Sequence, residues 1–312
     1  MRTCLDRWRD PLVQRIGYSG KPLYATKKNM RLLIKLFIGF TIFTLTVIFL
    51  FNRNKENKLE FVETKKSDIG VKGSFMIAAI GKDGIIVATE TRGNIFDLRD
   101  EKQTPIGYYD GVQKEFIIGS TVLANTGKGA IGNVFFSAVI NDFKAKLIAY
   151  PTVDAFFNVF KEFYSSCIPK EFQDQIESNL MLVAGFKEGK PMICYFQNST
   201  VGCIAGEGYV ESDTTIFADK YSKDLSCDVL AELAKDAIKK YSERKENWKT
   251  IGGDVCIIKI TKAEGPFWLK KIDFREWIYT TDLIKDYNAG KVNINLIAPF
   301  KKEDLEKVFY DK

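Results

Sequence analysis

The sequence predicts an α+β domain in which two antiparallel sheets stack between outer layers of helices, a four-layer αββα sandwich, behind one N-terminal transmembrane helix. The spacing of apolar residues indicates strands in some segments and helices in others, and the order of these segments supports the sandwich. Strands come first, then two consecutive helices, further strands, a helix and a last strand. This order fits neither a series of βαβ units nor an all-β fold, but it fits two sheets with helices on their outer faces. A long apolar run near the N-terminus supports the transmembrane helix.

This apolar run, residues 32–51, has the length of a membrane-spanning helix. It is apolar apart from Lys35 and three threonines, and about 20 residues at about 1.5 Å each match a bilayer core about 30 Å thick. A signal peptide would have a shorter apolar region and a small-residue cleavage site, and a buried core helix would show a polar face. We therefore expect a single-pass anchor in a lipid bilayer, with its orientation open because basic residues flank both ends.

The segments around the anchor differ in composition. The residues before it are basic and show no sustained period, which is typical of a disordered arm, and translation can start at Met1 or at Met30. The residues after it are charged and poor in apolar side chains, as in a tether. The net charge of +6 comes with no basic stripe in the globular part, so we expect no nucleic-acid partner. The arm, anchor, tether, sandwich domain and C-terminal extension are residues 1–31, 32–51, 52–72, 73–261 and 262–312.

A hairpin over residues 74–91 is expected to begin the domain. Its apolar arms meet at Lys82-Asp83-Gly84, and Asp-Gly between apolar runs is a strong hairpin signal because glycine accepts a positive φ. Gly127-Lys128-Gly129 and Pro151 are expected to open the two consecutive helices, and Ser226 is expected to cap a third. The other expected strands cover residues 115–118, 121–125, 180–186, 192–196, 201–205 and 254–261.

Cysteine and histidine usage narrows the possible chemistry. Six cysteines are scattered without a C-x-x-C pair, so we expect reduced, mostly buried thiols rather than a disulfide framework or a zinc site. The chain has no histidine, which excludes a Ser-His-Asp triad, a Cys-His dyad and a histidine metal motif. We expect no cofactor and no metal, and hydrolytic activity would need a general base other than imidazole.

The residues from Gly73 onward resemble a known family. Gly73-Ser74 stands at the head of the first strand, the Lys82-Asp83-Gly84 turn follows, and Glu90 and Lys114 come after it. In order and spacing the chain resembles the N-terminal-nucleophile (Ntn) hydrolase superfamily, specifically the proteasome β-subunit and its bacterial relatives, over residues 73–261. The resemblance implies the αββα fold. The further matching segments are residues 123–129, 182–186, 206–208, 224–226 and 252–254.

The resemblance also implies a set of catalytic residues. In that family self-cleavage after a glycine frees the nucleophile, which implies Gly73 as the cleavage site and Ser74 as the nucleophile. The α-amino group of Ser74, with a pKa near about 8, would be the base, so no histidine is needed. Glu90 stands where the family has an aspartate, and Lys114 matches the lysine that lowers the pKa of the nucleophile. The Gly127 N–H matches the oxyanion-hole donor.

Two departures from the family pattern bear on activity. Gly206-Glu207-Gly208-Tyr209 replaces the family's glycine-serine-glycine-serine, so the supporting serine is absent. No Arg-Asp pair precedes Gly252-Gly253 as it does in the family. Glu207, Glu243 and Glu246 are candidates to take over the missing roles.

Two functions remain open at this point. The first is a membrane-anchored, proteasome-like peptidase or amidase that acts on a peptide or amide substrate through Ser74. The second is a catalytically inactive Ntn-fold domain that serves as a membrane-tethered scaffold or binding module. A cut after Gly73 would separate the domain from its anchor. Members of the family often assemble into rings, so the resemblance also implies a homo-oligomer.

Overall fold

The computed structural model describes residues 59, 61, 69–73, 75–97, 104–212, 217–244 and 250–305. Contacts divide the chain between Lys58 and Leu59, and all described residues belong to the second part. The expected arm, the expected membrane span and Ser74 lie outside the described residues. Within the described ranges, no helix is both long enough and apolar enough to cross a bilayer.

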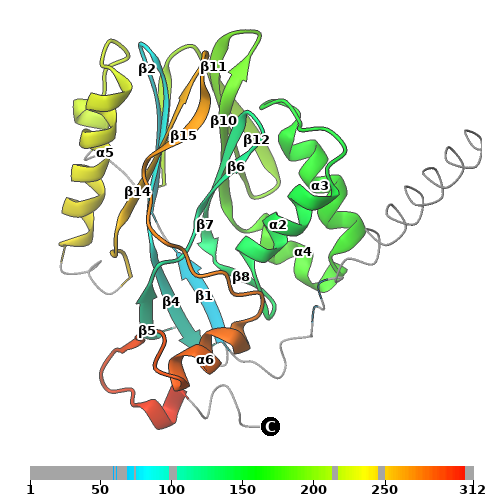
Figure 1. The fold of residues 1–312 in the computed structure, drawn as a ribbon, viewed down its shortest axis with the longest axis vertical. Coiled ribbons are helices and arrows are strands. Elements are labelled where there is room, and N and C mark those ends of the chain that lie inside the picture. The colour runs from blue at the N-terminus through cyan, green and yellow to red at the C-terminus, as the bar shows by residue number, and fades with distance from the viewer. Residues whose placement is uncertain are drawn as a thin grey trace, which may run out of the picture. The chain divides into compact units, whose positions relative to one another are not determined.

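Two antiparallel sheets face one another in this domain (Figure 1). The first sheet has the strand order β12-β11-β10-β7-β1-β4-β5-β16, with β6 also paired to β7. Its strands are β1 (Ile69–Gly73), β4 (Arg92–Asp97), β5 (Pro105–Asp110), β6 (Glu115–Ile118), β7 (Thr121–Lys128), β10 (Leu180–Lys187), β11 (Lys190–Gln197), β12 (Thr200–Ala205) and β16 (Asn295–Leu296). The second sheet, in spatial order, consists of β13 (Gly208–Glu211), β2 (Met76–Gly81), β3 (Gly84–Glu90), β14 (Val255–Thr261) and β15 (Gly265–Lys270). A small ribbon pairs β8 (Ala130–Ile131) with β9 (Val134–Phe135).

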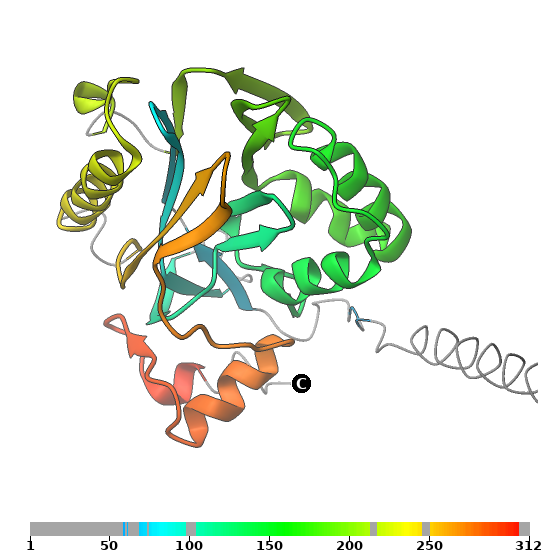
Figure 2. The same ribbon diagram turned by 45° about the horizontal axis from the view of Figure 1, so that its top comes forward.

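Helices cover the outer face of each sheet (Figure 2). Alternation along β10 shows the layering: Met181 and Val183 pack against the helices, whereas Leu182 and Ala184 pack against the other sheet. The layers are therefore helix, sheet, sheet and helix, in agreement with the predicted sandwich. On the first sheet lie α2 (Phe136–Lys146), α3 (Phe156–Cys167) and α4 (Lys170–Glu177), and on the second lies α5 (Cys227–Ser242).

Two of the places where the chain passes from one sheet to the other lie close together, because Met76 pairs with Thr89. The chain leaves the first sheet after Gly73 and enters the second at Met76, and it returns between Glu90 and Arg92. The tight turn between β2 and β3 at Lys82-Asp83 confirms the predicted hairpin. Both crossings therefore lie at the same end of the sandwich, where polar side chains collect.

The described structure differs from the sequence prediction at several boundaries. Residues 69–72, assigned to the tether, belong to β1, whose few apolar residues gave no strand signal. The first helix begins at Phe136 rather than after Gly127, because Gly127 (φ +104°) and Gly132 (φ +56°) have conformations incompatible with a helix. The residues before the helix form β8 and β9 instead. The second helix begins at residue 156 rather than at Pro151, and α4 was not predicted.

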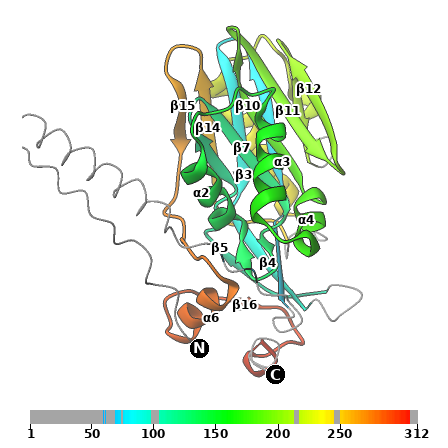
Figure 3. The same ribbon diagram turned by 90° about the vertical axis from the view of Figure 1, so that its right-hand side faces the viewer.

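The C-terminal extension is part of the fold. Its first segment, β15, pairs with β14, and its last described strand, β16, pairs with β5. Between them α6 (Thr280–Asn288) places Leu283 and Ile284 in a cluster with residues of β1, β4 and β5. Figure 3 shows α6 and β16 at the end of the domain where β4 and β5 lie. The extension therefore closes this end of the domain.

The prediction that all cysteines are reduced is wrong for one pair. Cys194 on β11 and Cys203 on β12 are directly opposite one another and form a disulfide, with their Cα atoms 4.0 Å apart. Their spacing in the sequence says nothing of this until the register of the hairpin is known. Cys167, Cys227 and Cys256 are free thiols, and the last two are buried.

Candidate functional site

The candidate site lies where β1 and β6 approach the same edge of β7. β6 pairs with the first half of β7, and β1 pairs with its end, so that Gly73 stands directly opposite Gly127. Lys114 precedes β6 immediately, and its carbonyl accepts a hydrogen bond from the Asn125 N–H at 3.0 Å. The end of β1 and the start of β6 are thus brought together along one strand.

Lys114 forms an ion pair with Glu90 in the interior of the domain. The Lys114 side chain is 4% exposed and that of Glu90 is not exposed at all. The other carboxylate oxygen of Glu90 accepts hydrogen bonds from the backbone N–H of Arg92 at 2.7 Å and of Gly252 at 3.4 Å. Desolvating two charges is costly, and the partners of both Glu90 oxygens offset part of that cost. The pair therefore fixes the Lys114 ammonium beside the end of β1.

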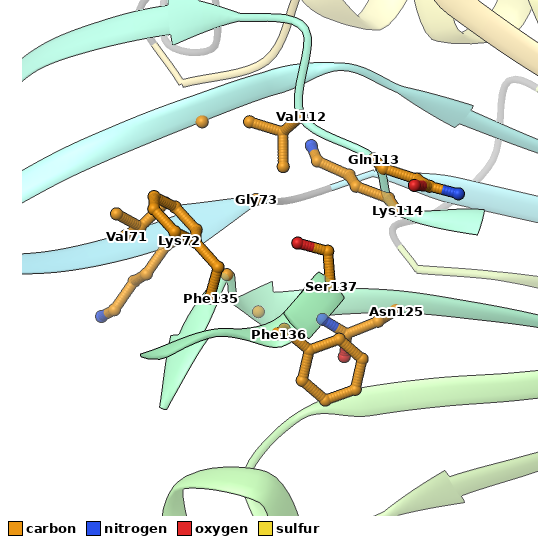
Figure 4. Close-up of a pocket in the computed structure, with 13 residues that line it drawn as sticks. Val71, Lys72, Gly73, Val112, Gln113, Lys114, Asn125, Phe135, Phe136 and Ser137 are labelled. Atoms are coloured by element: carbon orange, nitrogen blue, oxygen red, sulfur yellow. The ribbon is translucent and has the colours of Figure 1, made fainter. Parts of the chain in front are cut away.

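Gly73 lies against this ammonium. A Cβ added at Gly73 would lie 2.7 Å from Lys114 Nζ, so a side chain there would displace the lysine. A small cavity of about 20 Å³ opens beside Gly73 and Lys114, which is room for about one water molecule. Figure 4 shows Lys114 extended toward Gly73, with the Ser137 hydroxyl pointing into the same space.

Asn179 holds the backbone around Gly127. Its amide oxygen accepts from the Lys128 N–H at 2.7 Å, and its amide nitrogen donates to the Lys128 carbonyl at 3.1 Å. A Cβ at Gly127 would lie 2.7 Å from that oxygen, and the φ of +104° also requires glycine. Asn179 is fully buried, and nothing in the sequence pattern singled it out. This amide and Gly127 together fix the course of the chain opposite Gly73.

Glu115 is a third buried ionisable group at this end of the sandwich. Its side chain is not exposed, and neither carboxyl oxygen has a hydrogen-bond partner among the described residues. Burial raises the pKa of Glu115 to about 8, although the nearby Thr89 hydroxyl and the Lys114 charge pull the pKa down. At neutral pH Glu115 is therefore mostly protonated, and sequence analysis did not identify it.

The rim of the site is basic. Lys72 on β1 stands directly opposite Lys128 on β7. Burial lowers the pKa of both side chains, and the charge of Lys72 lowers the pKa of Lys128 further. The Lys72 ammonium lies 5.1 Å from the centre of the Phe96 ring, within reach of a cation–π contact. A negatively charged group in this region would meet a favourable field.

The structure brings most of the sequence-predicted site residues together. Gly73, Glu90, Lys114 and Gly127 meet around the end of β1. Ser74, the expected nucleophile, lies outside the described residues. Glu207 does not join this group, because its exposed side chain pairs with Lys223 at 2.6 Å in the turn after β12. Within the described part of the chain, no three metal-ligating side chains converge on a common point.

Comparison with known proteins gives distant structural likeness only. No protein-family model and no curated protein matches the sequence. Among solved structures, the chain is similar to Anbu (ancestral beta-subunit) from Yersinia bercovieri, with a TM-score of 0.46 and 10% sequence identity. The similarity covers 70% of this chain and 94% of that one. At this distance the likeness says nothing about activity, which has to be inferred from the geometry.

Proposed function

We propose that this protein is a proteasome-like Ntn hydrolase that cuts its own chain between Gly73 and Ser74 and then acts as a peptidase or amidase. One observation carries the proposal: a buried ammonium, that of Lys114, lies against Gly73 and is fixed there by Glu90. Gly73 is the residue whose carbonyl carbon must be attacked, and Ser74 follows it directly in the chain. The absence of histidine agrees with a nucleophile that uses its own amine.

The proposed chemistry assigns a role to each group. The Ser74 hydroxyl attacks the Gly73 carbonyl carbon, the peptide C–N bond breaks as its nitrogen takes up a proton, and an ester joins the two residues. Water then hydrolyses the ester, which leaves a carboxylate on Gly73 and restores the Ser74 hydroxyl. The Ser74 amine, freed in the first step, serves as the base toward other substrates. Lys114 stabilises negative charge on the reacting oxygens, and the Gly127 N–H, opposite Gly73, is the proposed oxyanion donor.

A scaffold or binding module is the second candidate, and the occupied position of β1 favours it. β1 is paired on both sides, and the cavity beside it has room for about one water molecule. With β1 in place, another peptide chain has no space beside Lys114. An inactive domain of this kind would keep its peptide bond after Gly73 intact.

The two candidates are separated by a comparison of serine variants. The full chain carries different tags at its two ends and is analysed on a denaturing gel. We expect two fragments from the unaltered chain and from Ser74→Thr, which keeps a hydroxyl, and a single band from Ser74→Ala. Ser178→Ala, which removes an exposed serine at the end of α4, is the matched control and should be cut. Equal cutting with and without the Ser74 hydroxyl would rule out the proposed nucleophile.

We also propose that residues 32–51 anchor the domain to a membrane and that the domain faces an oxidising compartment. The apolar run supports the first statement and the Cys194–Cys203 disulfide the second, because disulfides persist mainly in oxidising environments. Detergent, but not alkaline extraction, should release the protein from membranes, and alkylation without reductant should leave these two cysteines unmodified. Release by alkaline extraction would contradict the anchor.

The family resemblance adds a homo-oligomer to the proposal. The mass of the detergent-solubilised particle tests whether the protein is a homo-oligomer.

A further inference from the structure

We propose that β1 remains in the sheet after the chain is cut, so that the N-terminal fragment stays bound to the domain without a covalent link. That the protein makes this cut itself rests on the proposed function, but the retention of β1 does not. The partner of the domain would then be the chain's own released segment, which ends at Gly73. A cut domain would keep its expected membrane anchor in this way.

The pairing of β1 is two-sided. Four residue pairs join it antiparallel to β4, from Ile69 opposite Asp97 to Lys72 opposite Asn94. On its other side, Lys72 and Gly73 pair with the end of β7. A strand in the interior of a sheet uses both rows of its backbone hydrogen-bonding groups, unlike an edge strand. In each of these pairs the β1 residue lies N-terminal to the bond after Gly73 and its partner lies C-terminal to it. Breaking that bond therefore removes none of the pairs and leaves them joining the two fragments.

Side-chain contacts reinforce the pairing. Val71 is 1% exposed and packs in a cluster with Ile95 of β4 and Tyr109 of β5. Its carbonyl accepts a hydrogen bond from the Gly129 N–H at 2.6 Å. The Asn94 side chain donates to the Lys72 carbonyl at 3.3 Å. β1 is therefore held by buried apolar area as well as by backbone pairing.

The C-terminal extension closes over the same cluster. Trp277, Leu283 and Leu305 are buried there together with Val71. The extension is itself tied to β5 by the pairing of β16 and by the Ile297 N–H, which donates to the Ile106 carbonyl at 2.9 Å. For β1 to leave, these buried side chains must be uncovered. Retention is thus a property of the folded domain. A second chain reaches Lys114 only when β1 leaves the sheet, so retention limits the proposed peptidase or amidase activity to molecules that have released the N-terminal fragment.

Affinity recovery through the N-terminal tag tests the retention. The doubly tagged full chain is extracted in mild detergent and captured by its N-terminal tag, and a denaturing gel shows whether it has been cut. We expect the fragment that starts at Ser74 to be recovered in a one-to-one ratio with the N-terminal fragment. Cut fragments that separate in native buffer would overturn the proposal.

An uncut full chain would count against the proposed cleavage, and the retention is then tested on a split chain. Residues 1–73 and 74–312 are produced together as two tagged chains, so that the break is present by construction. Recovery of the second chain with the first supports retention, and its loss overturns it, whatever the catalytic activity.

A pair of valine variants locates the interaction. Val71→Asp places a carboxylate in the buried cluster and should reduce co-recovery at least about tenfold. Val201→Asp, at an exposed valine of β12, should leave co-recovery unchanged. Equal co-recovery of both variants would show that β1 is not the element that holds the fragment. If Val71→Asp fails to fold, the unaltered split chain still decides the question.

Discussion

The layer between the two sheets has two ends of different character. One end is apolar: its fully buried residues include Ile85, Val87, Ile258 and Ile260. The other end, beside β1, contains the Lys114–Glu90 pair and the carboxyl of Glu115, for which the described part of the chain offers no hydrogen-bond partner. Apolar packing is sufficient to hold two sheets together, whereas burying ionisable groups costs free energy. The fold alone does not account for the charged end, so the functional proposal rests on that end.

Removing Lys114 should have the largest effect on stability. Lys114→Met keeps most of the side-chain length but leaves the Glu90 carboxylate buried without its cation. We expect a loss of about 3–5 kcal/mol in the free energy of unfolding, measured by urea denaturation at neutral pH. The double variant Lys114→Met with Glu90→Gln should regain much of the loss, because a neutral amide oxygen can still accept the two backbone N–H groups. If Lys114→Met alone were as stable as the unaltered chain, the buried ion pair would not set the charged end apart from the apolar end.

Glu115 should make stability depend on pH. The folded protein holds its proton up to a pKa of about 8, whereas the unfolded chain releases it near 4.5. Between these values the folded state binds more protons, so stability should fall as pH rises, by up to about 1.4 kcal/mol per pH unit, and level off above the folded pKa. In Glu115→Gln this contribution should vanish. Urea denaturation at several pH values checks it, and identical pH profiles for both proteins would contradict the raised pKa.

Trimming the apolar end should have the smallest effect. Ile258→Val removes one methylene group from a fully buried residue of β14. We expect a loss of about 0.5–1.5 kcal/mol in the free energy of unfolding and no change in the cutting after Gly73. If Ile258→Val were stable but no longer cut, the apolar end would take part in the chemistry, and the two ends would not differ in function.

Local signals made several elements predictable from the sequence. The Asp83-Gly84 turn fixed the β2–β3 hairpin, and Ser226 accepts a hydrogen bond from the Val229 N–H at the start of α5. The order of strand and helix patterns along the chain gave the layering. Each of these features depends on residues close together in the chain.

The candidate site depends on contacts between distant residues, and there the sequence was less informative. Glu90 and Lys114 are 24 residues apart and were identified through the family resemblance, not through any periodicity. β1 was taken for a tether because Ile-Gly-Val-Lys-Gly has few apolar residues, and its partners β4 and β7 come later in the chain. The disulfide between β11 and β12 likewise depends on a register that spacing does not reveal.

The intact mass of the purified full-length protein tests the central claim most directly. If the Lys114 ammonium serves cleavage at Gly73, the spectrum should contain a chain that begins with Ser74, and Lys114→Met should lack it. A single uncut mass for the unaltered protein would contradict the hydrolase and leave the charged end of the sandwich to a binding role.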